Sequence, residues 1–151
     1  MDLFEEFFKI ARQFDKMHVQ YALIGGIAMA FHDEPRFTKD IDFLVLPEEL
    51  EKVRKALKEI EYFESAEPWT FKSSGVTLHR FMKVDGERHM IIDILLATNE
   101  RHRQIIKRCI EDEWKDGVIK IISKQDLIWM KQQRNSDQDR VDIRTLNNDE
   151  D

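Results

Sequence analysis

The chain has 151 residues, enough for one domain with a hydrophobic core of its own. Hydrophobic residues make up 42% of the chain and charged residues 36%, which excludes an intrinsically disordered chain and indicates a heavily solvated surface. The formal net charge of −6 excludes a protein that coats duplex DNA through electrostatics alone, although a local basic patch can still contact the end of a nucleic acid.

The sequence carries no signal for a membrane or for export. The longest nearly unbroken apolar run, residues 21–31, is too short to span a bilayer, and the acidic N-terminus lacks the basic segment and cleavage site of a signal peptide. Cys109 is the single cysteine and cannot form an internal disulfide. We expect a cytoplasmic protein with no membrane partner.

The first half of the chain predicts alternating helices and strands. Apolar residues at three- and four-residue steps indicate an amphipathic N-terminal helix, and short apolar runs closed by glycine or proline indicate strands. The predicted elements are a helix over 2–17, a strand over 21–24, a turn at 25–26, a short helix over 27–31, a strand over 40–46 and a helix over 47–60.

The second half predicts a hairpin followed by helices. Asp85-Gly86 is a strong hairpin signal, while Asn99 and Ser123 are good N-caps. The predicted elements are one or two strands over 70–84, a strand over 89–96, a helix from 99 to about 110, a strand over 118–122 and a C-terminal helix after 123, with 147–151 disordered. We therefore expect a single domain over residues 1–151, with a small mixed sheet flanked by helices in an α/β or α+β arrangement.

Asp40 and Asp42 are two residues apart on a predicted strand, so their carboxylates point to the same face. Two such groups repel each other unless a cation lies between them, and oxygen ligands of this kind suit Mg²⁺. The alternative is a pair of strand-end residues that face water.

Asp93 lies in an otherwise apolar strand, where an ionised carboxylate is costly unless it is paired or bound to a metal. A third carboxylate that faces Asp40 and Asp42 would complete a two-metal site. The alternative is an Asp at a sheet edge or one paired with an arginine.

Gly25 and Gly26 follow a predicted strand and precede a predicted helix. Glycines in this position let the backbone approach a phosphate, although the pair is also compatible with an ordinary turn.

Together these features resemble the nucleotidyltransferase superfamily of the DNA polymerase β type. The order is strand, Gly-Gly, short helix, Asp-Ile-Asp-Phe on the next strand, and a later Asp on an apolar strand. The AbiEii-like and minimal nucleotidyltransferases of toxin–antitoxin systems are the most similar members. The residues that carry this closer resemblance are Ala28, His32, Arg36 and Thr38 before the Asp pair, and Lys131, Arg134, Asp139 and Asp142 near the C-terminus.

The resemblance implies roles for individual residues. Asp40 and Asp42 would be the primary metal ligands and Asp93 the third carboxylate. Gly25 and Gly26 would hold the triphosphate, and Lys131 would contact it as a compact point charge. Many members have a serine after the first glycine, whereas Gly26 offers no hydroxyl.

Several basic side chains also have structural interpretations. Arg36 either contacts phosphate or pairs with Asp33 or Glu34, and Lys131 either contacts phosphate or is a solvated helix residue. His32 is expected to form a local hydrogen bond rather than to contact nucleotide. The basic residues of 101–108 form either a solvated helix face or a local patch for nucleic acid.

The predicted function is transfer of a nucleoside monophosphate from an NTP to a hydroxyl group, with Mg²⁺ or Mn²⁺ as the cofactor. The acceptor would be a protein or an RNA, such as a cognate toxin or antitoxin or a tRNA. Two rival hypotheses are an inactive protein of this fold that acts as an antitoxin by contact, and a metal-dependent nuclease that needs no NTP.

Overall fold

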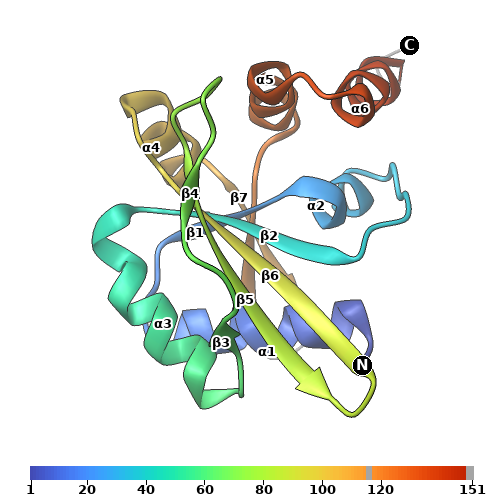
Figure 1. The fold of residues 1–151 in the computed structure, drawn as a ribbon. Helices are drawn as coiled ribbons and strands as arrows, with labels where there is room; N and C mark the ends of the chain where they lie inside the picture. Colours follow the sequence, from blue (N-terminus) through green and yellow to red (C-terminus); the bar gives the residue numbers. More distant parts are fainter. Residues whose placement is uncertain (115–116, 149–151) are drawn as a thin grey trace.

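A computed structural model describes residues 1–114 and 117–148, and a mixed sheet is the centre of this structure (Figure 1). In the described residues, eight strands form one sheet in the order β3-β5-β6-β2-β1-β8-β7, and β4 pairs with β5. The strands are β1 (Tyr21–Ile24), β2 (Asp40–Val45), β3 (Phe63–Glu64), β4 (Trp69–Thr70), β5 (Thr77–Asp85), β6 (Arg88–Leu96), β7 (Ile110–Trp114) and β8 (Gly117–Ile121).

Parallel and antiparallel pairs alternate in the middle of the sheet. β2 is antiparallel to β1 and parallel to β6, and β1 is parallel to β8. Hairpins flank this centre, with β5 antiparallel to β6 and β7 antiparallel to β8. Gly86 has a positive φ in the predicted β5–β6 turn, where a residue without Cβ is favoured. The expected mixed sheet with flanking helices is confirmed.

Helices cover the sheet on both sides (Figure 1). They are α1 (Leu3–Lys16), α2 (Gly25–Phe31), α3 (Leu50–Glu59), α4 (Glu100–Lys107), α5 (Lys124–Arg134) and α6 (Asp137–Asn148), with one turn of 3₁₀ helix over Pro47–Glu49. Phe7 and Phe14 of α1 pack against Phe43 of β2, and all three are fully buried. Because side chains alternate along a strand, Asp40 and Asp42 point to the opposite face, toward α5.

Several expectations about the elements are wrong, and the two-residue strand β3 was not predicted. The helix after Asn99 ends at Lys107, and β7 follows it where no strand was predicted. The C-terminal helix is two helices, because Asn135 takes a left-handed conformation with φ 54° and Ser136 caps α6 through the Asp139 amide. α6 continues through Asn147 and Asn148, where disorder was predicted, and residues 149–151 lie outside the described residues.

None of the helices in the described residues is long and apolar enough to cross a membrane.

Candidate active site

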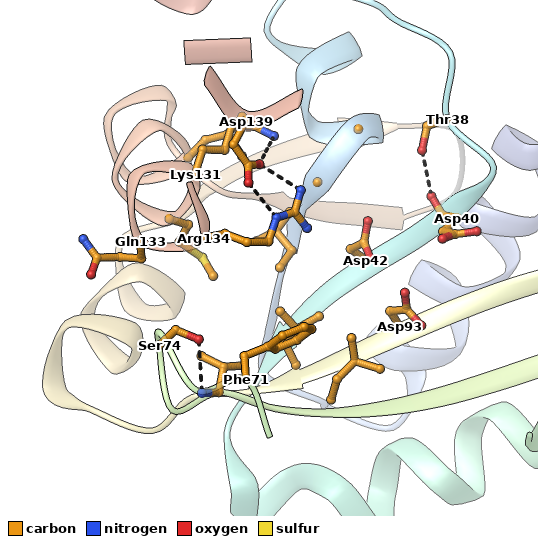
Figure 2. Close-up of a pocket in the computed structure, with 18 of the residues that line it drawn as sticks. Thr38, Asp40, Asp42, Phe71, Ser74, Asp93, Lys131, Gln133, Arg134 and Asp139 are labelled. Carbon is orange, nitrogen blue, oxygen red and sulfur yellow. Dashed lines mark hydrogen bonds and ion pairs between the residues drawn. The ribbon is translucent and has the colours of Figure 1, made fainter. Parts of the chain in front are cut away.

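A pocket of about 450 Å³ lies over the carboxylate face of the sheet (Figure 2). Strands β2, β5 and β6 form its floor, and α5 and the start of α2 form two of its sides. The β4–β5 hairpin adds an apolar side with Trp69, Phe71 and Val76. Figure 2 shows the carboxylates of Asp40, Asp42 and Asp93 together at one end, with Arg134 and Lys131 on the helix beside them. Every residue predicted for the site lines this pocket.

The three predicted carboxylates lie on neighbouring strands. Asp42 and Asp93 are direct register partners of parallel β2 and β6, and Asp40 lies on the same face as Asp42. Burial and the charges of Asp93 and Asp40 raise the pKa of Asp42 to about 7. Burial and Asp93 also raise the pKa of Asp40. Carboxyl groups in a pocket whose pKa values are raised by burial and by a neighbouring charge are a marker of functional sites.

Asp93 is paired with an arginine, which is the alternative that the sequence left open. Arg80 on β5 is its register partner, and its Nε and Nη2 lie 2.8 and 3.0 Å from the two oxygens of Asp93. As the side chains stand, no group of three His, Cys, Asp or Glu in the described part of the chain is placed to hold a metal ion.

The Gly25–Gly26 turn approaches the carboxylates through its backbone. Gly25 has φ +75°, and a Cβ there would lie 2.2 Å from an oxygen of Asp42. A Cβ on Gly26 would lie 2.7 Å from Cβ of Thr38. Close packing therefore favours glycine at both positions, and the positive φ favours it at Gly25 as well. The predicted strand end before the glycines is confirmed, whereas residues 25–26 form the first turn of α2, which was predicted to begin at residue 27.

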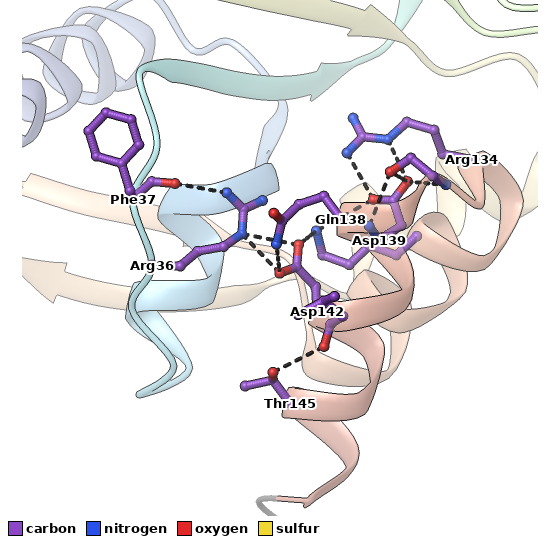
Figure 3. Close-up of polar contacts among 10 residues, drawn as sticks. Arg36, Phe37, Arg134, Gln138, Asp139, Asp142 and Thr145 are labelled. Atoms are coloured by element: carbon purple, nitrogen blue, oxygen red, sulfur yellow. Dashed lines mark hydrogen bonds and ion pairs between the residues drawn. The ribbon is translucent and has the colours of Figure 1, made fainter.

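Arg36 and Lys131 meet at Asp142, a buried carboxylate of α6. Figure 3 shows Arg36 beside Asp142. Nε of Arg36 lies 2.9 and 3.1 Å from the two oxygens of Asp142, and Nζ of Lys131 lies 2.9 Å from one of them. Burial alone would raise the pKa of Asp142, but hydrogen bonds from Lys131, Arg36 and Gln138 outweigh it and hold the pKa below its ordinary value. Arg36 therefore pairs with neither Asp33 nor Glu34, and Lys131 is not a solvated helix residue.

A second buried carboxylate holds Arg134, which also lines the pocket. Both oxygens of Asp139 lie 2.8 Å from the Arg134 guanidinium, and Ser136 donates to the same carboxylate. Arg134 and Asp139 are among the residues that carry the family resemblance, but the resemblance implied no role for either of them. The Ser-x-x-Asp pattern at Ser136 was a local signal for this second helix start.

The other basic side chains are engaged elsewhere. The local hydrogen bond predicted for His32 is wrong, because its Nε2 lies 2.8 Å from the carbonyl oxygen of Ile122, a residue distant in sequence. Arg101 and Arg108 both bind Asp126, and Arg103 pairs with Glu48. The basic residues of 101–108 are thus largely used in ion pairs within the protein.

Residues 10–146 match the model of one protein family, described as "Nucleotidyl transferase AbiEii toxin, Type IV TA system". The chain belongs to the AbiEii nucleotidyltransferase family. This confirms the resemblance and the class of enzyme that the motifs around Asp40 and Asp42 predict. No curated protein sequence matches the chain.

Solved structures similar to this AbiEii family member show a shared fold. TM1012 from Thermotoga maritima, a proposed nucleotidyltransferase, has a TM-score of 0.68 at 13% identity, covering 97% of this chain and 92% of that one. Lincomycin-bound LnuA, a lincosamide antibiotic adenylyltransferase, has a TM-score of 0.60 at 20% identity and covers 95% of both chains. ANT(2")-Ia with adenylyl-2"-tobramycin has a TM-score of 0.57 at 14% identity, covering 94% of this chain and 86% of that one.

Proposed function

We propose that this protein is a Mg²⁺-dependent nucleotidyltransferase that transfers a nucleoside monophosphate from an NTP to an acceptor hydroxyl. The observation that carries the proposal is the placement of Asp42 opposite Asp93, with Asp40 beside them, on the floor of a pocket bordered by the Gly25–Gly26 turn. The acceptor oxygen would form a bond to the α-phosphorus, and the bond to the bridging oxygen of pyrophosphate would break.

The charges around the pocket fit a divalent cation. Acidic and basic side chains lining the described pocket are equal in number, and buried Asp142 adds a further negative charge behind Lys131. A highly charged triphosphate would gain little from such a neutral site without additional positive charge. Burial and the neighbouring carboxylate of Asp93 raise the pKa values of Asp40 and Asp42 despite the cations around them, so a bound divalent cation would favour their ionised forms.

Asp40 and Asp42 would hold the metal ion, with Asp93 as the third carboxylate. Mg²⁺ needs only one or two protein carboxylates when the substrate's phosphates supply further oxygens. When bound, the ion would lower the pKa of the acceptor hydroxyl and neutralise charge on the departing pyrophosphate. Mn²⁺ would bind the same oxygen ligands.

The protein's own groups would orient the substrates. The Gly25–Gly26 backbone would lie against the phosphates of the NTP. Asp142 fixes the side chains of Lys131 and Arg36, which would limit the movement of these phosphates. Asp93 would accept the proton of the attacking hydroxyl. Trp69 and Phe71 give the opposite side of the pocket an apolar surface suited to a flat ring.

The acceptor would be a protein hydroxyl or an RNA end within a cytoplasmic toxin–antitoxin system. The family description supports the toxin–antitoxin context. The net charge of −6 favours a protein acceptor over RNA. The structural neighbours are LnuA, an antibiotic adenylyltransferase with bound lincomycin, and ANT(2")-Ia in complex with adenylyl-2"-tobramycin, so the same fold also accepts small molecules.

The test is incubation of the purified protein with each α-labelled NTP and Mg²⁺, with total tRNA in one series and proteins from the source lysate in another. Transfer of label to one class of acceptor supports the proposal and identifies that class. An inactive binding partner would transfer nothing and would gain no thermal stability from ATP and Mg²⁺. A nuclease would cleave nucleic acid without NTP.

A further inference from the structure

The guanidinium of Arg80 contacts two other side chains of the pocket. It donates two hydrogen bonds to Asp93, and its Cζ lies 5.2 Å from the ring centroid of Trp69 on β4. All three residues line the pocket. Arg80 therefore lies between the carboxylate group and the aromatic hairpin, in contact with both.

This ion pair occupies the carboxylate that the proposed reaction needs. Both oxygens of Asp93 accept from Arg80, so the guanidinium neutralises that carboxylate, whereas no arginine or lysine of the described residues forms an ion pair with Asp40 or Asp42. Within the described residues, Arg80 supplies the only side-chain hydrogen bonds to Asp93. A carboxylate whose charge is neutralised by a guanidinium attracts a metal ion or a proton less strongly than a free one.

Other carboxylate–arginine pairs of the protein are built differently. Asp126 and Asp139 also bind arginines side-on, but Asp126 binds a second arginine, Arg101, and Asp139 accepts additional hydrogen bonds from Ser136. Each of these carboxylates would keep a partner if its side-on arginine left. The carboxylate of Asp93 would have no such partner if Arg80 left, unless another cation replaced the guanidinium.

We propose that Arg80 is a positioning residue that keeps Asp93 neutralised until a divalent cation enters, and that the guanidinium then moves onto Trp69. The indole provides the second position because the cation–π contact already exists before the ion pair breaks. The inference rests on the proposed function, since it assumes that Asp93 belongs to the metal and acceptor site. It makes Arg80 a competitor of the metal ion rather than a phosphate ligand.

The first test measures Mn²⁺ binding by calorimetry, without NTP, for the wild type, Arg80→Gln and Arg103→Gln. Arg80→Gln removes the competing cation, and we expect Mn²⁺ affinity to rise about tenfold or more, as loss of a charge-assisted ion pair implies. Arg103→Gln is the matched control, because Arg103 forms an ion pair with Glu48 on the surface, outside the pocket. Its Mn²⁺ affinity should equal that of the wild type.

The second test measures whether Trp69 holds the displaced guanidinium. Trp69→Leu should lower Mn²⁺ affinity by up to about threefold, because the contact with the indole would strengthen once the guanidinium has left Asp93. In the Arg80→Gln background the same change should have no effect, because there is no guanidinium left to hold. A purely structural tryptophan would give equal effects in both backgrounds, and that result would refute the movement onto Trp69.

The outcomes separate this inference from the proposed function. If the wild type binds Mn²⁺, Asp42→Asn abolishes that binding and Arg80→Gln stays within twofold of the wild type, Arg80 is a structural partner and the inference is wrong while the proposed function stands. If the wild type binds no Mn²⁺, both are wrong. Arg80→Lys covers the case in which Arg80→Gln does not fold: it keeps the charge but loses the two-point contact, and we expect a rise of about threefold. An unchanged affinity in Arg80→Lys would then refute the inference.

Discussion

Asp42 on β2 and Asp93 on β6 are register partners in adjacent parallel strands, so two acidic side chains share one face of the sheet next to Asp40. The arrangement opposes stability, because burial and the neighbouring carboxylates raise the pKa of Asp42 to about 7. Arg80 forms its ion pair with Asp93, and its charge offsets only part of the rise in the pKa of Asp40. These carboxylates repel one another at one end of the pocket, and a cation that binds between them would explain why they lie together.

Asp42→Asn should stabilise the metal-free protein, and only above weakly acidic pH. The carboxyl group titrates near 3.8 when unfolded and near 7 when folded, so the folded state binds the proton more tightly and stability falls as pH rises between these values. At about pH 8 the free energy of unfolding should rise by up to about 4 kcal/mol in the variant, and at about pH 5 by much less. Urea denaturation at both pH values measures the difference. Equal effects at both would show that Asp42 does not carry this repulsion.

Mn²⁺ affinity of the wild type should increase with pH through the same range. A metal ion binds the ionised carboxylate, and Asp42 loses its proton only near pH 7. Calorimetric titrations at about pH 6 and about pH 8 should therefore show several-fold tighter binding at the higher value. Asp42→Asn should bind no Mn²⁺ at either pH. An affinity independent of pH would place the metal site away from Asp42.

Gly25→Ala should reduce both stability and transfer activity. The new Cβ would lie 2.2 Å from an Asp42 oxygen at a residue with φ +75°, so the turn or the carboxylate must move. We expect a loss of about 2 kcal/mol or more in stability and about 100-fold in turnover. Gly86→Ala is the matched control: its φ is +63°, but nothing lies within 4 Å of the added Cβ. Gly86→Ala should lower the stability only through backbone strain and leave the transfer activity unchanged. Equal losses of activity in the two variants would contradict the close approach of Gly25 to Asp42.

Lys131→Ala should raise KM for the NTP more than it lowers kcat, because phosphate charge is present in both ground and transition states. It should also lower stability by about 2 kcal/mol, since buried Asp142 keeps Arg36 and Gln138 but loses its third donor. Steady-state kinetics and urea denaturation separate the two effects, with exposed Lys107→Ala as the control. A KM within twofold of the wild type would give Lys131 a purely structural role.

The parts of the fold and the site that the sequence predicted are those with local signals. The strands around Leu23, Phe43 and Ile92 have continuous apolar runs, and Asp85-Gly86 fixes the hairpin between β5 and β6. The alternation Asp40-Ile41-Asp42-Phe43 determines which face each side chain takes. These patterns were sufficient to place the three aspartates and the two glycines of the pocket.

The remaining features depend on contacts between distant segments. Arg36 and Asp142 are far apart in sequence, and no local pattern indicates that they pair. β7 contains an acidic run, Glu111 to Glu113, that shows no strand alternation and forms a strand only through pairing with β8. Asn135 looks like an interior residue of a helical pattern, although its left-handed conformation ends α5.

The most direct test of the central claim is a comparison of wild type and Asp40→Ala in transfer of label from an α-labelled NTP in the presence of Mg²⁺. Loss of a metal ligand removes several kcal/mol of transition-state stabilisation, so the variant should transfer label about 100-fold more slowly or worse. Wild-type transfer that depends on Mg²⁺ and falls to this extent in Asp40→Ala is the predicted result. An Asp40→Ala variant that transfers label at half the wild-type rate would show that the chemistry takes place elsewhere.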